Sequence, residues 1–129
     1  MDETKMNIDE ITFFDKMPDA LPLYEAVRNL ICSEFERVAI KVQKTQITFS
    51  NKYGFAFVSL PYRRVKGRPD VYIIFTLGLS YRLEHPRIME ATEPYPGRWT
   101  HHIIIQNVDE VDSEIKEWVA EAYSFAMIK

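Results

Sequence analysis

The sequence VAIKVQKTQITFS, residues 38–50, decides the fold of this chain. Val38, Ile40 and Val42 alternate with less apolar residues, and the same alternation continues over residues 47–50. Side chains that alternate with a period of two leave a strand on opposite faces. We therefore expect two β-strands here, each with one face in water.

The strand pattern continues along the middle of the chain. Two denser apolar runs, residues 55–60 and 71–77, each follow a turn-forming segment, and their density favours central strands covered on both faces. Residues 99–106 are typical of a further strand. For residues 79–87 we expect an edge strand or a loop, because Pro86 argues against a central strand.

Helical patterns flank these strands. Residues 8–14 favour a short helix, and residues 21–31 place apolar side chains on one helical face. A last helix is expected after Asp109, a plausible N-cap. The sequence therefore predicts an α+β fold: a two-layer sandwich of a mostly antiparallel sheet, with about four to six strands, covered by N-terminal and C-terminal helices.

Length and composition favour one domain. The chain has 129 residues, of which 47% are hydrophobic, so we expect a single domain over residues 1–129 with a flexible N-terminus at residues 1–7. Cys32 is the only cysteine, and no internal disulfide is possible. With no signal-peptide pattern and no apolar run of ~20 residues, the expected location is the cytoplasm, without membrane contact.

Several segments resemble the DUF5655 family, namely residues 20–27, 44–49, 55–61 and 93–102. The resemblance extends from about Ile11 to Phe125. It implies a family of unknown function whose members occur alone or attached to larger proteins, some nuclease-like or restriction-associated. More distantly, the strand-rich middle and acidic final helix are similar to DUF1801 or YdhG-like domains, some of which are discussed as frataxin-like iron handlers, but no motif maps an iron ligand onto this chain.

Functional groups gather in residues 93–102, EPYPGRWTHH. Arg98 follows a Pro-Gly turn, which can hold its guanidinium for bidentate contact with a carboxylate or phosphate; an ion pair with Glu93 or Glu90 is the alternative. His101 and His102 leave a strand on opposite faces and cannot clasp one metal ion. One of them could join Arg98 and Tyr95 around an anion or shuttle a proton, or simply be hydrogen-bonded within the sheet.

Two further groups of polar residues are candidates. Lys44, Gln46 and Thr48 share one strand face and could line a polar concavity, although exposure to solvent explains the same alternation. Residues 61–102 carry seven Lys and Arg against four Asp and Glu, in a chain of net charge −3. Within that segment, loop cations could form a basic rim for a nucleic-acid backbone, or could be ordinary exposed charges: Arg63, Arg64, Lys66, Arg68, Arg82 and Arg87.

The sequence contains no phosphate-binding glycine loop, nucleophile elbow or metal-ligand spacing, so we expect no metal and no cofactor. The leading hypothesis is a non-catalytic binding module for an anionic ligand, either a phosphorylated molecule or a nucleic acid. One alternative is a small hydrolase-like or proton-transfer enzyme that uses His101 or His102 with Arg98, Lys44 and a carboxylate such as Glu93. Another is a protein–protein interaction or homodimerisation domain. These functional hypotheses require folding to gather Lys44, Arg98 and an imidazole around one hollow.

Overall fold

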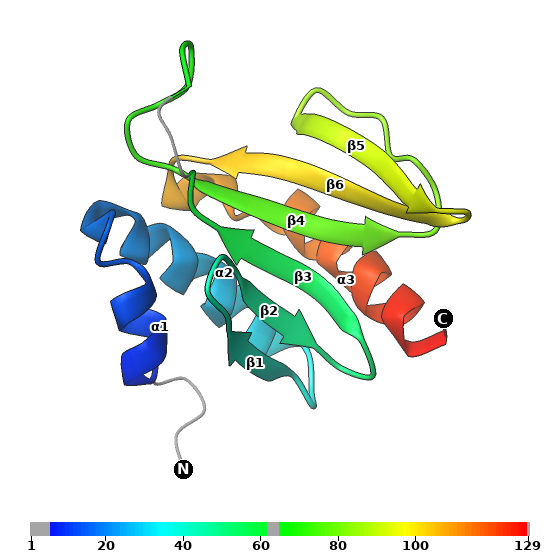
Figure 1. Cartoon of the computed structure of the whole chain (residues 1–129). Helices are drawn as coiled ribbons and strands as arrows, with labels where there is room; N and C mark the ends of the chain where they lie inside the picture. Colours follow the sequence, from blue (N-terminus) through cyan, green and yellow to red (C-terminus); the bar gives the residue numbers. More distant parts are fainter. Residues whose placement is uncertain (1–5, 62–64, 129) are drawn as a thin grey trace.

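A single antiparallel sheet with helices on one side organises the protein. The computed structural model describes residues 6–61 and 65–128. Its elements follow one another in the order α1 (Ile8–Phe13), η1 (Pro18–Ala20), α2 (Leu21–Glu34), β1 (Ala39–Val42), β2 (Ile47–Ser50), β3 (Gly54–Ser59), β4 (Ile73–Leu79), β5 (Ile88–Tyr95), β6 (Arg98–Ile105), η2 (Val108–Glu110) and α3 (Ser113–Ile128). The strand order in the sheet is β1-β2-β3-β4-β6-β5, with every neighbouring pair antiparallel (Figure 1). The predicted α+β sandwich is confirmed.

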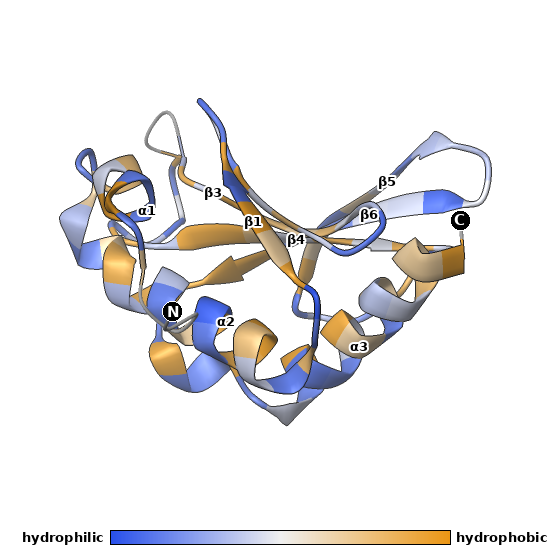
Figure 2. Ribbon diagram, turned by 90° about the horizontal axis from the view of Figure 1, so that it is seen from below, coloured by the Kyte–Doolittle hydropathy of each residue, from blue (hydrophilic) through white to orange (hydrophobic). Residues whose placement is uncertain are grey.

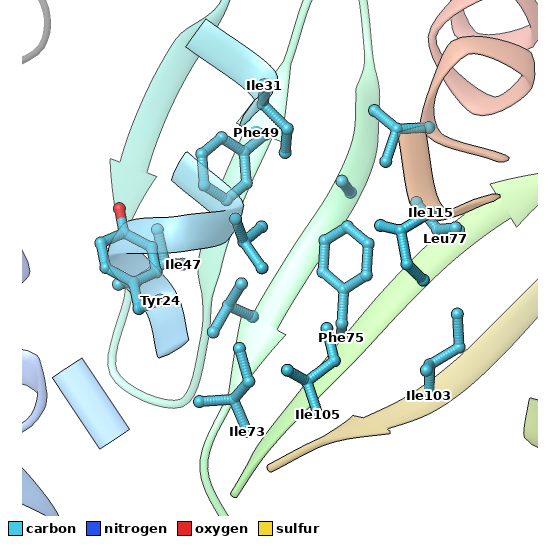
Figure 3. Close-up of a cluster of buried hydrophobic side chains, with 14 of the residues drawn as sticks. Tyr24, Ile31, Ile47, Phe49, Ile73, Phe75, Leu77, Ile103, Ile105 and Ile115 are labelled. Carbon is cyan, nitrogen blue, oxygen red and sulfur yellow. The ribbon is translucent and has the colours of Figure 1, made fainter. Parts of the chain in front are cut away.

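The core lies between the sheet and the helices. On β4, Ile73, Phe75 and Leu77 are buried, and Ile103 and Ile105 on β6 are buried beside them (Figure 3). Helices α2 and α3 lie on the same side of the sheet, and α3 contacts β3 and β4 (Figure 2). The helices therefore cover the apolar side chains on one face of the sheet only.

The opposite face of the sheet is open. Among the described residues no helix lies on it, and the edge strands β1 and β5 curl away from the helices (Figure 2). Phe57 on β3 and Ile74 on β4 are therefore only half-buried. The expectation that both central strands are covered on both faces is wrong, because the three helices cover only the face that carries Phe75.

The connection from β4 to β5 is a loop, one of the two alternatives expected for residues 79–87, whereas β5 itself was not predicted. Residues 80–87 form a loop, and the edge strand is β5, at residues 88–95, which the apolar pattern did not indicate. The sequence did not predict β5 because most of its residues are exposed on both faces. Its apolar and polar residues therefore do not alternate. Pro94 is tolerated near its end, as expected for an edge strand.

The start of the last helix is also later than predicted. Asp109 lies in the short 3-10 helix η2, which Asn107 and Glu110 cap, and α3 begins only at Ser113. The Asp112 side chain accepts a hydrogen bond from the Ile115 amide at 3.2 Å and so caps the new helix.

At the other end of the chain, the predicted flexible stretch at residues 1–7 is described only in part. Residues 1–5 lie outside the described residues, Met6 packs against the core, and Asn7 caps α1.

A buried charged network joins α1 to α2. Glu10, only 1% exposed, accepts hydrogen bonds from the Tyr24 hydroxyl and from Arg28 Nε, the latter at 2.7 Å. Burial raises the pKa of Glu10, but the hydrogen bonds from Arg28, Tyr24 and the Asn7 backbone outweigh it and hold that pKa below its ordinary value. The carboxylate therefore stays charged and fixes the short helix α1 onto α2.

Replacing Glu10 with glutamine tests this network. We expect Glu10→Gln to lower the free energy of unfolding by about 3 kcal/mol, because Arg28 remains buried without its counter-charge. Urea denaturation at neutral pH measures the change. Because the folded state lowers the Glu10 pKa, its stabilisation is present above the unfolded pKa and is lost as the pH falls through the folded pKa, so the two proteins should converge in acid.

Asp9→Asn is the matched control, because Asp9 is exposed in the same helical turn. We expect it to change the free energy of unfolding by no more than about 1 kcal/mol. Equal losses in the Glu10 and Asp9 variants would contradict a specific role for the buried network.

Candidate functional site on the open sheet face

The two adjacent histidines of β6 have different environments. His101 faces the helices and is fully buried, whereas His102 faces the open side of the sheet and is half-buried. The Leu83 amide, in the 80–87 loop, donates a hydrogen bond to His101 Nε2 at 2.8 Å. His101 is therefore a structural residue beneath the sheet, and His102 is the imidazole that a ligand on the open face can reach.

Burial also favours the uncharged form of His101. Burial lowers the His101 pKa, and the charges of His102 and Arg82 lower it further. A backbone contact with Leu77, the register partner of His101, raises this pKa but does not outweigh them. His101 Nδ1 is buried and completes no hydrogen bond with a described residue. A neutral ring suits this site, because Nε2 must carry a lone pair to accept from the Leu83 amide.

His102 lies at the centre of a polar row that crosses three strands. Thr76 on β4 and Glu90 on β5 are its register partners on either side. Thr76 Oγ1 lies 2.8 Å from His102 Nδ1, and Glu90 Oε1 lies 4.0 Å from His102 Nε2. The hydroxyl fixes the orientation of the ring and leaves Nε2 directed toward the exposed edge strand.

Two glycines on this face have contrasting surroundings. A Cβ on Gly54 would lie 3.0 Å from the Phe57 ring, so that ring already occupies the space over Gly54. A Cβ on Gly78 would meet no atom within 4 Å, and Gly78 does not have a positive φ. Neither backbone conformation nor crowding requires glycine at this central strand position. The open space over Gly78 lies between Thr76, two residues earlier, and Thr100, its register partner on β6.

Arg98 lies on the same face of β6 as Thr100 and His102, because these residues alternate with the helix-facing positions. It is exposed and makes no ion pair with a described residue, and its register partner Tyr95 is 67% exposed. The Glu93 carboxylate accepts a hydrogen bond from the Gly97 amide at 3.0 Å and forms no ion pair with Arg98. The Arg98 guanidinium, which forms no ion pair with a described residue, therefore lies about two residues, or roughly 7 Å, beyond Thr100.

The structure does not bring Lys44 to this site. Lys44 lies in the turn between β1 and β2, at the end of the sheet opposite to Arg98. Three strand steps, about 14 Å, also separate β2 from β6. The expected gathering of Lys44, Arg98 and an imidazole around one hollow is therefore not formed.

Gln46 and Thr48 belong to a separate polar cluster. The Thr48 hydroxyl donates to Gln43 Oε1 at 2.6 Å, and Gln46 Nε2 donates to Gln43 Oε1 and Thr48 Oγ1 at 3.3 and 3.2 Å. These side chains satisfy one another, which accounts for the polar alternation of β2 without a ligand.

The predicted basic rim is not continuous across the described residues. Arg63 and Arg64 lie outside the described residues, and Lys66 and Arg68 lie in the loop before β4. Arg82 lies beyond the other end of β4, close to the Trp99 ring.

Arg87 is already paired. It contacts Asp112 and Glu114, both at 3.0 Å, and the Glu110 carbonyl at 2.6 Å, so it ties the loop to the start of α3. It is therefore not available to a ligand in this arrangement.

Sequence reasoning missed the members of the site that lie in the apolar strand. Thr76 and Gly78 interrupt the run VYIIFTLGL at residues 71–79 with a period of two, and this interruption was the available signal. Thr100 follows the same alternation on β6. Glu90 carried no signal, because the strand that holds it was not recognised.

Other features of the described residues lie apart from this face. A hollow of about 480 Å³ lies against the helix side, lined by residues from the end of β4 and from α3 that include Leu79 and Phe125. No group of three or more His, Cys, Asp or Glu residues in the described part of the chain is placed to hold a metal ion. Of the helices described, none has the length and apolar character needed to cross a membrane.

Comparison with known proteins gives the family of this fold. The family model DUF5655, described as a domain of unknown function, matches residues 10–126. The chain belongs to the DUF5655 family. The match includes all six strands and therefore the whole open face of this DUF5655 domain. Neither the curated proteins nor the solved structures contain a match to the chain.

The buried imidazole leads to a test by pH. Because the folded state lowers the His101 pKa, the unfolded chain binds the proton more strongly, and stability should fall as the pH drops below about 6.5. We expect His101→Leu, which removes this titration, to flatten the loss of unfolding free energy between about pH 7.5 and pH 5. Urea denaturation at several pH values measures both profiles.

His102→Gln is the control, since His102 faces the open side and no buried amide depends on it. That variant should keep the pH dependence of the wild type. A His101→Leu profile as steep as that of the wild type would show that other groups cause the loss.

Proposed function

We propose that this DUF5655 domain is a binding module that takes a small anionic ligand, such as a phosphorylated molecule, on the open face of its sheet. The ligand would lie over Gly78, between Arg98 at one end and the Thr76–His102 pair at the other. The side chains of Thr76, Thr100 and His102 border this space, and Arg98 supplies a positive charge at its end.

The open space over Gly78 is the observation that supports this proposal most strongly. Glycine in a strand interior is less stable than alanine by about 0.5–1 kcal/mol. At Gly54 that loss has a structural reason in the Phe57 ring, whereas at Gly78 no atom lies within 4 Å of the missing Cβ. Glycine inside a strand often marks a bulge, a bend, or a place where a ligand or another backbone approaches closely, and the pairings of β4 contain no bulge.

A proton-transfer enzyme is the second candidate, favoured by the contact of Thr76 Oγ1 with His102 Nδ1 at 2.8 Å. A hydroxyl, an imidazole and the Glu90 carboxylate in a row can pass a proton. Lys44 has no part in this version because it lies at the opposite end of the sheet. If the domain catalyses a reaction of the bound anion, His102→Gln should abolish that reaction. Anion binding through Arg98 should persist in the same variant, and this combination would favour the enzyme.

Nucleic-acid binding and homodimerisation stay predictions, and strong salt dependence of binding would favour the former. We also infer a reducing cytoplasmic setting, since Cys32 is the sole cysteine and no internal disulfide supports the fold.

Filling the space over Gly78 tests the proposed binding. Gly78→Val introduces a residue that strands favour, at a position with open space, and we expect it to raise the free energy of unfolding by about 0.5–1 kcal/mol. The same variant should lose the binding of inorganic phosphate and of phenyl phosphate. Chemical shifts of the β4 and β6 amides, followed during titration to millimolar concentration, measure both affinities.

Ser59→Val is the matched control, because Ser59 lies on the same face but is paired with Ile74 rather than placed beside Gly78. It should bind the probes as the wild type does. If no probe shifts the β4 and β6 amides of the wild type, or if Gly78→Val binds as tightly as the wild type, the proposal is wrong.

A further inference from the structure

We infer that the ligand carries its negative charge on a planar aromatic group, as aryl phosphates and nucleoside monophosphates do. This inference rests on the proposed function, since it concerns the same site over Gly78. The inference depends on the residues at the sides of the space over Gly78, and not on Arg98 at its charged end.

The wall on the β3 side is an aromatic ring. Phe57 is the register partner of Thr76, and its ring leans along β3 toward Gly54, where its Cζ would lie 3.0 Å from an added Cβ. Because β3 and β4 are neighbours, this ring borders the β3 side of the open space, more than 4 Å from the position of an added Cβ on Gly78. Phe57 is half-buried, so part of its ring remains accessible from the open face.

The floor and the opposite wall also suit a flat group. Gly78 has no side chain, so the floor is bare backbone, which a planar ring can approach without meeting a Cβ. On the β6 side, Thr100 is held by the Thr92 hydroxyl, with the two oxygens 2.8 Å apart. A ring over Gly78 would meet the edge or face of Phe57 on one side and the Thr100 methyl group on the other.

The positions of Arg98 and His102 along β6 predict which way the anionic group of the ligand points. A ring over Gly78 has Arg98 beyond Thr100 in one direction and His102 in the other. Arg98 makes no ion pair with a described residue, whereas His102 already has Glu90 4.0 Å from its Nε2. The anionic group therefore points toward Arg98, and the ring lies between Phe57 and Thr100.

Four probes separate the contributions of ring and charge: inorganic phosphate, cyclohexyl phosphate, phenyl phosphate and adenosine monophosphate. We expect phenyl phosphate to bind about fivefold more tightly than cyclohexyl phosphate, the advantage of an aromatic contact. Phe57→Leu should remove this preference and leave the affinity for inorganic phosphate unchanged. Thermal unfolding of the variant checks that it folds.

The outcomes distinguish this inference from the proposed function. Equal affinities for the phenyl and cyclohexyl compounds, or an unchanged preference in Phe57→Leu, would overturn the aromatic inference and leave anion binding intact. Absence of binding by all four probes would overturn both. Binding of adenosine monophosphate more tightly than phenyl phosphate would favour a nucleotide as the ligand, and the opposite order would favour a smaller aryl phosphate.

Discussion

One-sided burial of the sheet is the constraint on which the rest of the structure depends. The apolar alternation of β2, β3, β4 and β6 directs its largest side chains toward α2 and α3, and no described helix remains for the other face. Side chains on the open face are thereby released from core packing. Thr76, Thr100 and His102 can be polar, and Gly78 can be bare, because none of them fills the core.

The route of the chain between β4 and β5 preserves this open face. β4 and β5 run in the same direction with β6 between them, so the connecting loop must return along the length of the sheet. It returns on the helix side, where the Leu83 amide reaches His101 and His85 Nε2 lies 3.1 Å from Glu114. A return on the other side would have covered Gly78. The same loop thus seals one histidine and leaves its neighbour accessible.

The sequence was sufficient for the fold class and insufficient for the site, for a physical reason. Apolar periodicity reports which side chains are buried, so it predicted α2, β1 to β4 and β6 with small errors at their ends. It could not detect β5, which is exposed on both faces, and therefore missed Glu90. The order β4-β6-β5 depends on contacts distant in sequence, so nothing in the residues showed that Lys44 lies at the wrong end to join Arg98.

The number of charged residues in a sequence segment does not show which of them are free to bind a ligand, because some are paired within the fold. Arg87 contributed to the basic middle of the chain, yet two carboxylates and a carbonyl of the α3 region hold it. The Glu90 carboxylate lies 4.0 Å from His102 Nε2 and opposes the approach of an anion to this imidazole. Arg98 supplies the positive charge on this part of the open face. Anion affinity on this face is therefore expected to depend mainly on Arg98, and His102 borders the site.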